Sequence, residues 1–98
     1  DGKLKLLLTK GEAIAADHVV LATGYKVNME NIPFLANGNI RLATKDGFPV
    51  LDEHFQSSIP GLFVTSLPAT QDFGPFFAFT VSVGASAKVI GDAVKDRI

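Results

Sequence analysis

The stretch FVTSLPATQDFGPFFAFT, residues 63–80, leads from a short apolar run through a loop to an apolar-striped segment. The loop contains Asp72, Gly74 and Pro75. Four phenylalanines, Phe73, Phe76, Phe77 and Phe79, surround it. Such a junction is either a packed corner or a place where a helix N-terminus meets a ligand, because the first N–H groups of a helix lack partners within it. The stretch predicts a strand-to-helix turn, and these residues alone leave both interpretations open.

Beyond this junction, apolar residues recur at spacings of four, four, three and four: Phe79, Val83, Ala87, Ile90 and Val94. This period is typical of one face of an amphipathic helix, which we expect from about residue 76 to residue 96. Pro75 is tolerated as a first helical residue because its missing N–H would be unpaired there. Gly84 and Gly91 each cost a helix roughly 1 kcal/mol relative to Ala, which predicts a close approach of the helix to a sheet or ligand.

Two apolar runs rich in β-branched residues, residues 18–22 and 62–66, are predicted strands. Val19, Val20 and Leu21 follow one another without a polar break, as in strands of parallel sheets that are covered on both faces. With the long helix, these runs predict an α/β fragment. We expect it to form one unit over residues 1–98.

Two hairpins and a short helix complete the predicted elements. Residues 3–8 alternate Lys and Leu like a half-buried strand, and a Lys10-Gly11 turn leads into a second strand at residues 12–16. Residues 40–43 and 48–51 flank Lys45-Asp46-Gly47, an Asp-Gly hairpin signal. A short helix is expected over residues 30–35.

The composition limits the classes of partner. The chain is 47% hydrophobic with eight Phe, which is rich for 98 residues and predicts apolar faces covered by the rest of a longer parent chain or by a self-associated copy. A net charge of −1 gives no basic surface for nucleic acid. The absence of Cys excludes disulfides and thiolate catalysis, and fits a cytoplasmic location. The most apolar window, residues 73–87, is shorter than the ~20 residues of a membrane span.

The candidate binding residues lie where the predicted strands end. Ligands of open α/β sheets lie outside the carboxyl ends of the strands, which here lead into Thr23-Gly24 and Ser66-Leu67. Thr23-Gly24 is also compatible with a simple turn, the four Phe with core or lining, and Asp72 with a helix cap. His18 and His54 have no ligand-spaced partner. We therefore predict no catalytic residue and no metal site.

Taken together, two motifs resemble a known superfamily. DHVVLATGY, residues 17–25, resembles the strand-plus-ATG segment of two-dinucleotide-binding-domain flavoproteins. Its ATGY form looks like that of flavin-containing and N-hydroxylating monooxygenases. IPGLFVTSLPA, residues 59–69, resembles the late PGLFxxG strand of the same enzymes. The resemblance implies the C-terminal part of a Rossmann-like FAD/NAD(P)-binding domain, with β-hairpins and a long C-terminal helix.

The resemblance also implies a set of cofactor-binding positions. Thr23 and Gly24 would lie near the cofactor crevice, and Ser66 and Leu67 beside the flavin ribityl chain. The residues that would approach the isoalloxazine are Gly74, Pro75, Phe76 and Phe77. The sequence departs from the pattern twice: many relatives have Gly-Asp where this chain has Ser66-Leu67, and no G-x-G-x-x-G fingerprint occurs. The chain is therefore expected not to hold FAD or NADPH by itself.

The implied function is that of an FAD- and NADP-dependent monooxygenase-like oxidoreductase. In such enzymes a flavin hydroperoxide oxygenates a nitrogen, a sulfur or a ketone of a small-molecule substrate. A pyridine nucleotide-dependent flavin reductase is a second interpretation. A third, from another class, is a non-catalytic interaction domain with a Phe-rich surface. The 98-residue piece alone is not expected to be active.

Overall fold

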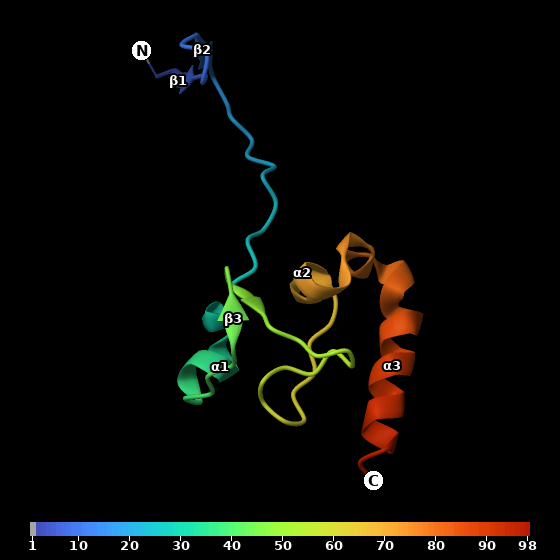
Figure 1. Ribbon diagram of the computed structural model, residues 1–98. Helices are drawn as coiled ribbons and strands as arrows, with labels where there is room; N and C mark the ends of the chain where they lie inside the picture. Colours follow the sequence, from blue (N-terminus) through green and yellow to red (C-terminus); the bar gives the residue numbers. More distant parts are fainter. Residues whose placement is uncertain (1) are drawn as a thin grey trace.

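The computed structural model describes residues 2–98, and it is elongated, with extents of 66 × 32 × 21 Å. Its radius of gyration is 19.3 Å, whereas a compact domain of 100 residues has about 13 Å. Figure 1 shows the reason: an N-terminal hairpin stands apart from the remainder at the end of an extended segment. We refer to residues 2–26 as the arm and to residues 27–98 as the body.

The arm begins with the predicted hairpin. Strands β1 (Leu4–Leu7) and β2 (Ala13–Ala16) pair antiparallel, with Leu4 opposite Ala16. The hairpin is confirmed, but the prediction that its first strand is half-buried is wrong. Leu4 is 51% and Leu7 77% exposed, because no other element of the described chain covers either face of the two-stranded ribbon.

Residues 17–26 follow as an extended segment without secondary structure. The predicted strand over residues 18–22 is therefore wrong for this structure. A strand exists only as a member of a hydrogen-bonded ladder, and no backbone group of residues 18–22 has such a partner in the described chain. Val20 is 90% and Leu21 80% exposed. The segment has the composition of a buried strand without the sheet that would bury it.

The body starts with short elements packed around Met29 and Leu35, which are 4% and 3% exposed. They are η1 (Met29–Asn31), α1 (Pro33–Asn37), β3 (Thr44–Lys45) and β4 (Phe48–Pro49). The expected helix at residues 30–35 is thus split, with Pro33 as the first residue of α1. The predicted second hairpin is confirmed with shorter strands, and its turn residues Asp46 (φ 54°) and Gly47 (φ 85°) both have the positive φ of a type I′ turn.

Residues 62–66, the second predicted strand, form a single bridge instead. Phe63 is bridged antiparallel to Gln56 across the Pro60-Gly61 turn, and the Val64 N–H donates to the Phe55 carbonyl at 2.9 Å. The prediction of a full strand is wrong because only one edge of the segment meets another stretch of the described chain. Pairing on that edge ends after two backbone hydrogen bonds.

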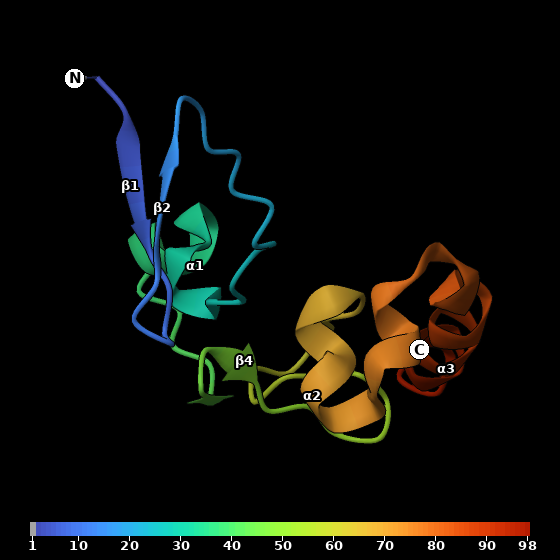
Figure 2. The same cartoon turned by 90° about the horizontal axis from the view of Figure 1, so that it is seen from above.

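The remaining chain is helical but interrupted. It comprises η2 (Leu67–Ala69), α2 (Thr70–Phe73), η3 (Pro75–Ala78), η4 (Thr80–Ser82) and α3 (Val83–Lys95). Figure 2 shows α2 and α3 as separate bodies joined by the 3-10 turns. The predicted helix over residues 76–96 is therefore confirmed only from Val83 onward. It is broken before that point because Phe79 is extended, at φ −103° and ψ 148°.

Phe55 forms the centre of the second part of the core. It is 1% exposed, stacks on Phe73 at 3.8 Å between ring centroids and meets Phe77 at 5.2 Å. Phe73 and Phe77 are half-buried against this ring, whereas Phe76 and Phe79 are 49% and 65% exposed.

The close approach predicted at the two glycines of α3 is not found. A Cβ at Gly84 or Gly91 would meet no heavy atom within 4 Å in the described chain. No helix of residues 2–98 has the length and apolarity to cross a membrane.

Candidate functional site

A groove of about 330 Å³ lies where residues 62–66 end and α3 begins. We call it the 65–90 groove. Its lining residues are Thr65, Ser66, Ala78, Phe79, Thr80, Ser82, Val83, Ser86, Ala87 and Ile90. The groove is therefore built from the stretch that the sequence singled out as a strand-to-helix junction, together with one face of the first two turns of α3.

Ser66 has an unusual backbone conformation at the edge of this groove. Its φ of 67° and ψ of −148° fall in a region occupied almost only by glycine. The conformation turns the chain out of the extended run and into η2, where the Ser66 carbonyl accepts the Ala69 N–H at 2.9 Å. Many of the resembled flavoproteins carry Gly at this position. The serine thus retains a glycine-type turn at a cost of about 1–3 kcal/mol in backbone strain.

The two buried hydroxyls of the groove are already engaged. Ser82 and Ser86 are 2% and 4% exposed. The Ser82 hydroxyl donates to the Phe79 carbonyl at 2.7 Å, and the Ser86 hydroxyl donates to the Val83 carbonyl at 3.2 Å. Each hydroxyl bonds the carbonyl of the residue three positions earlier, so these groups present little polarity to a ligand. The groove suits an apolar or flat aromatic group, and no acid or base lines it.

The structure does not bring all the predicted cofactor residues together. Thr23 and Gly24 lie in the extended segment of the arm, where a Cβ at Gly24 would meet no heavy atom within 4 Å. Ser66 lines the groove and Leu67, 41% exposed, follows it. Figure 1 shows the arm segment running away from the α2–α3 region. The described residues therefore do not form a complete dinucleotide site.

Gly74, Pro75, Phe76 and Phe77 form the start of η3, beside the groove but outside its lining. Gly74 has φ 95° and ψ 167°, a conformation that requires glycine. Asp72 does not cap a helix N-terminus as expected. Its Oδ2 accepts the Leu51 N–H at 2.8 Å. Asp72 is the third residue of α2, which begins at Thr70, so it does not stand at a helix N-terminus. Its carboxylate instead holds the loop after β4 against α2.

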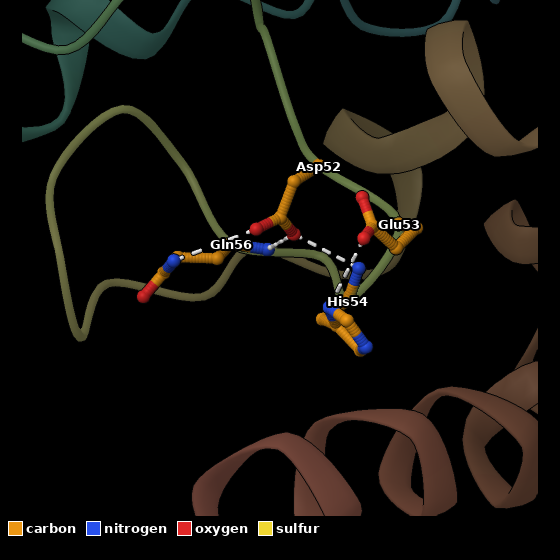
Figure 3. A network of polar contacts seen from close by, with 4 residues as sticks. All are labelled: Asp52, Glu53, His54 and Gln56. Carbon is orange, nitrogen blue, oxygen red and sulfur yellow. Dashed lines mark hydrogen bonds and ion pairs between the residues drawn. The ribbon is translucent and has the colours of Figure 1, made fainter. Parts of the chain in front are cut away.

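Asp52, Glu53 and His54 form a second polar cluster, drawn in Figure 3. One Asp52 oxygen accepts the N–H groups of His54 and Gln56 at 2.8 and 2.9 Å. Desolvation acts to raise the pKa of Asp52, but these two backbone hydrogen bonds, together with the Gln56 side-chain amide and the charge of His54, hold the pKa below its ordinary value. His54 Nδ1 lies 3.8 Å from a Glu53 carboxylate oxygen. All three residues are exposed, and the Asp52 carboxylate accepts hydrogen bonds within its own turn.

Sequence reasoning missed two features of this region. Phe55 gave no signal, since it sits in a loop at φ 65° and outside any periodic pattern. Thr80 was not singled out, although it lines the groove together with Phe79. The helical stripe placed Phe79 on the apolar face of a continuous helix, whereas Phe79 lies in the break before α3, where it lines the groove and is 65% exposed.

The comparisons with known proteins place the chain among flavoenzymes. Residues 1–65 match the sequence profile of the pyridine nucleotide-disulphide oxidoreductase family. The chain is also 36% identical over 70 residues to an NADH oxidase of Streptococcus pneumoniae (strain ATCC BAA-255 / R6), a match that covers 71% of this chain and 14% of that relative. No solved structure matches. Because the family profile covers more than half of its residues, this chain belongs to the pyridine nucleotide-disulphide oxidoreductase family.

Proposed function

We propose that the chain is the C-terminal part of an FAD- and NADP-dependent oxidoreductase and forms one wall of its flavin site. The match of residues 1–65 to the pyridine nucleotide-disulphide oxidoreductase family carries this proposal. The engaged hydroxyls and apolar lining of the 65–90 groove add physical support, since they suit the exclusion of water from a redox cofactor.

In this proposal the rest of a longer protein supplies what the described residues lack. Dinucleotide pyrophosphates need glycine-rich turns at helix N-termini, and the chain has no such fingerprint. Ser66 and Leu67 would face the flavin side chain, with Gly74, Pro75, Phe76 and Phe77 nearer to the ring. Thr23 and Gly24 lie in the arm, and they would reach the flavin only if the arm were positioned differently relative to the body. FAD itself would accept a hydride from the pyridine nucleotide.

Two reactions compete for the final step. Oxygen transfer to a nitrogen, a sulfur or a ketone is favoured by the ATGY form of residues 22–25 and by Ser66-Leu67 in place of Gly-Asp. Electron transfer from a pyridine nucleotide without substrate oxygenation is favoured by the relative named NADH oxidase. We propose the oxygenase and retain the reductase or oxidase as the second candidate.

A chimera tests the flavin proposal. The matched segment of the Streptococcus NADH oxidase, with the residues that follow it as far as needed, is replaced by all 98 residues of this chain, so that positions 74 and 88 are included. The proposal expects a yellow protein that oxidises a pyridine nucleotide. A folded chimera without flavin absorbance bands would show that the segment does not form a flavin wall. Oxygenation of an amine or sulfide, against reduction of oxygen alone, separates the two reactions.

Matched variants in the chimera locate the contact. Gly74→Leu should alter the flavin potential and its reduction rate, because a branched side chain at φ 95° both strains the turn and blocks approach to η3. Lys88→Ala, on the exposed face of α3 where Lys88 pairs with Asp92 at 2.9 Å, is the control. If Gly74→Leu remains folded with the potential and rate of the parent chimera, the junction does not face the flavin.

A further inference from the structure

Two side-chain hydrogen bonds tie distant parts of the body together. The Ser58 hydroxyl accepts the Ala43 N–H at 2.7 Å, and the Asp72 carboxylate accepts the Leu51 N–H at 2.8 Å. The other side-chain hydrogen bonds of residues 2–98 join residues at most five positions apart. The bond from Asp72 spans 21 positions. It joins the loop after β4 to α2, which lies between β4 and α3 in Figure 2 and leads directly into the junction at residues 74–77.

Helix α2 is a single turn of four residues, which is not stable by itself, so contacts with other segments must fix its orientation. Apolar packing holds its two ends. Ala69, the residue before it, is 0% exposed, and the Phe73 ring stacks on Phe55 with 3.8 Å between centroids. Such packing is not directional and leaves rotation about the line between the two ends unrestrained. The hydrogen bond from Asp72 to Leu51 restrains this rotation, because a hydrogen bond weakens steeply as its angle changes.

The junction inherits the orientation of α2. Only Gly74 separates α2 from η3, and its φ of 95° and ψ of 167° set the angle between them. Pro75, the first residue of η3, has a φ that its ring fixes. The Phe77 N–H donates to the Gly74 carbonyl at 3.2 Å, and the Phe77 ring lies 5.2 Å from that of Phe55. A rotation of α2 would therefore displace residues 74–77 together and separate the Phe77 ring from Phe55.

The Asp72 carboxylate is suited to orient α2 without being needed for folding. It is exposed, and its hydrogen-bond partner in the described chain is the Leu51 N–H. A hydrogen bond to an ionised group is roughly twice as strong as a neutral one. Removal of an exposed carboxylate leaves no buried charge, so loss of this bond should change the orientation of α2 more than the stability of the body.

We propose that Asp72 is a positioning residue of the flavin site, because its hydrogen bond to the Leu51 N–H sets the rotation of α2 and so directs residues 74–77 toward the isoalloxazine. The inference rests on the proposed function, in which residues 74–77 lie nearest to the flavin ring. Asp72 does not touch the cofactor and acts through Gly74. The loop after β4 is thereby coupled to the flavin wall.

Nuclear Overhauser effects between phenylalanine rings test the orienting bond in the 98-residue chain without flavin. Asp72→Ala should weaken the contacts between Phe55 and Phe77 and retain those between Phe55 and Phe73. Ser58→Ala, which removes the other long-range bond, is the matched control and should retain both. Unchanged Phe55–Phe77 contacts in Asp72→Ala would overturn the proposal. Loss of both contacts would also overturn it, because the bond would then be a general stabilising contact.

The chimera with the NADH oxidase measures the consequence at the flavin. With flavin content unchanged, Asp72→Ala should shift the flavin potential and slow flavin reduction about tenfold to a hundredfold, as a displacement of about 1 Å would. Asp72→Asn should restore most of the rate, since its amide oxygen can accept the Leu51 N–H in a bond about half as strong. Ser58→Ala should keep the rate of the parent chimera.

The two measurements separate this inference from the proposed function. A parent chimera without flavin would overturn the proposed function and the role of Asp72 toward the cofactor, while the ring contacts still decide whether Asp72 orients the junction. A yellow Asp72→Ala chimera with the potential and reduction rate of its parent would overturn the positioning role alone. An Asp72→Asn chimera as slow as Asp72→Ala would also contradict it, because the hydrogen bond would then not be the cause.

Discussion

The arm and the body use similar residues to different effect. The arm has Val20, Leu21 and Tyr25 exposed by 90%, 80% and 97%, while the body buries Phe55 to 1%. The strands of the arm pair with each other, but only the body has segments whose side chains pack into a buried core. Each Å² of apolar surface that is buried stabilises the fold by about 25 cal/mol, and burial requires a second surface against which the first can pack. Stability in this chain therefore follows from the convergence of segments and not from apolar content.

The largest expected difference between the two regions comes from truncating an aromatic side chain in each. Phe55→Ala removes the ring that stacks on Phe73 at 3.8 Å, and should lower the free energy of unfolding of the body by about 3–5 kcal/mol. Tyr25→Ala, in the arm, should leave it unchanged because the tyrosine is 97% exposed. Urea titrations of both variants provide the measurement. Similar midpoints for the two would mean that Phe55 is not the centre of a core.

The second difference concerns glycine at positive φ. Gly74→Ala should destabilise the body by about 1–3 kcal/mol, because φ 95° with ψ 167° excludes a side chain although a Cβ would touch nothing within 4 Å. Gly24→Ala, at φ 77° in the arm, should cost little, since nothing holds that backbone in place. Thermal melts compare the two. An equal loss at both positions would show that the arm is also a constrained structure.

A smaller effect of opposite sign is expected at Ser66. Ser66→Gly relieves the strain of φ 67° and ψ −148°, offset by the greater freedom of glycine in the unfolded chain. We expect a net gain of about 1 kcal/mol in the free energy of unfolding of the body, measured by urea titration. Thr9→Gly, at an exposed residue of the arm, is the control and should bring no gain. Loss of stability in Ser66→Gly would contradict the strain assignment.

The smallest expected effect is a loss of stability of the body at low pH. The pKa of Asp52 is lowered in the folded body, so its contribution to stability is present above the unfolded value near 3.8 and is lost as the pH falls through the lower folded pKa. Chemical shifts of the His54 and Gln56 amides should report this loss. Asp52→Asn should remove the acid step, while Asp17→Asn in the arm should not. An acid step of equal size in Asp52→Asn would assign it to another group.

The sequence was most informative where structure is local. The two hairpins and the helix from Val83 onward were predicted, because each is specified by its own turn residues or periodicity. Residues 18–22 and 62–66 were not predicted correctly, because a strand depends on a neighbour that lies elsewhere in the sequence. The run Val19-Val20-Leu21 has the composition of a strand buried on both faces, but composition cannot state whether a covering sheet is present.

The candidate site was predicted in part for the same reason. Ser66 was identified as lying at the end of an apolar run, and it lines the groove. Its strained backbone was not foreseen, since serine gives no sign of positive φ. The break at Phe79 was hidden by a stripe that continues through it, and the carboxylate of Asp72 accepts the Leu51 N–H across a separation in sequence that no local pattern reveals.

The hairpin construction has a consequence for the speed of folding. Each strand pair and the Gln56–Phe63 bridge join stretches that are neighbours along the chain, across the turns at Gly11, Gly47 and Gly61. Loops this short close within about 10–100 ns, and hairpins form in about 1–10 μs. Topologies dominated by such nearby contacts fold faster than those that must first join distant segments. The body should therefore acquire its structure in stages as each turn leaves the ribosome.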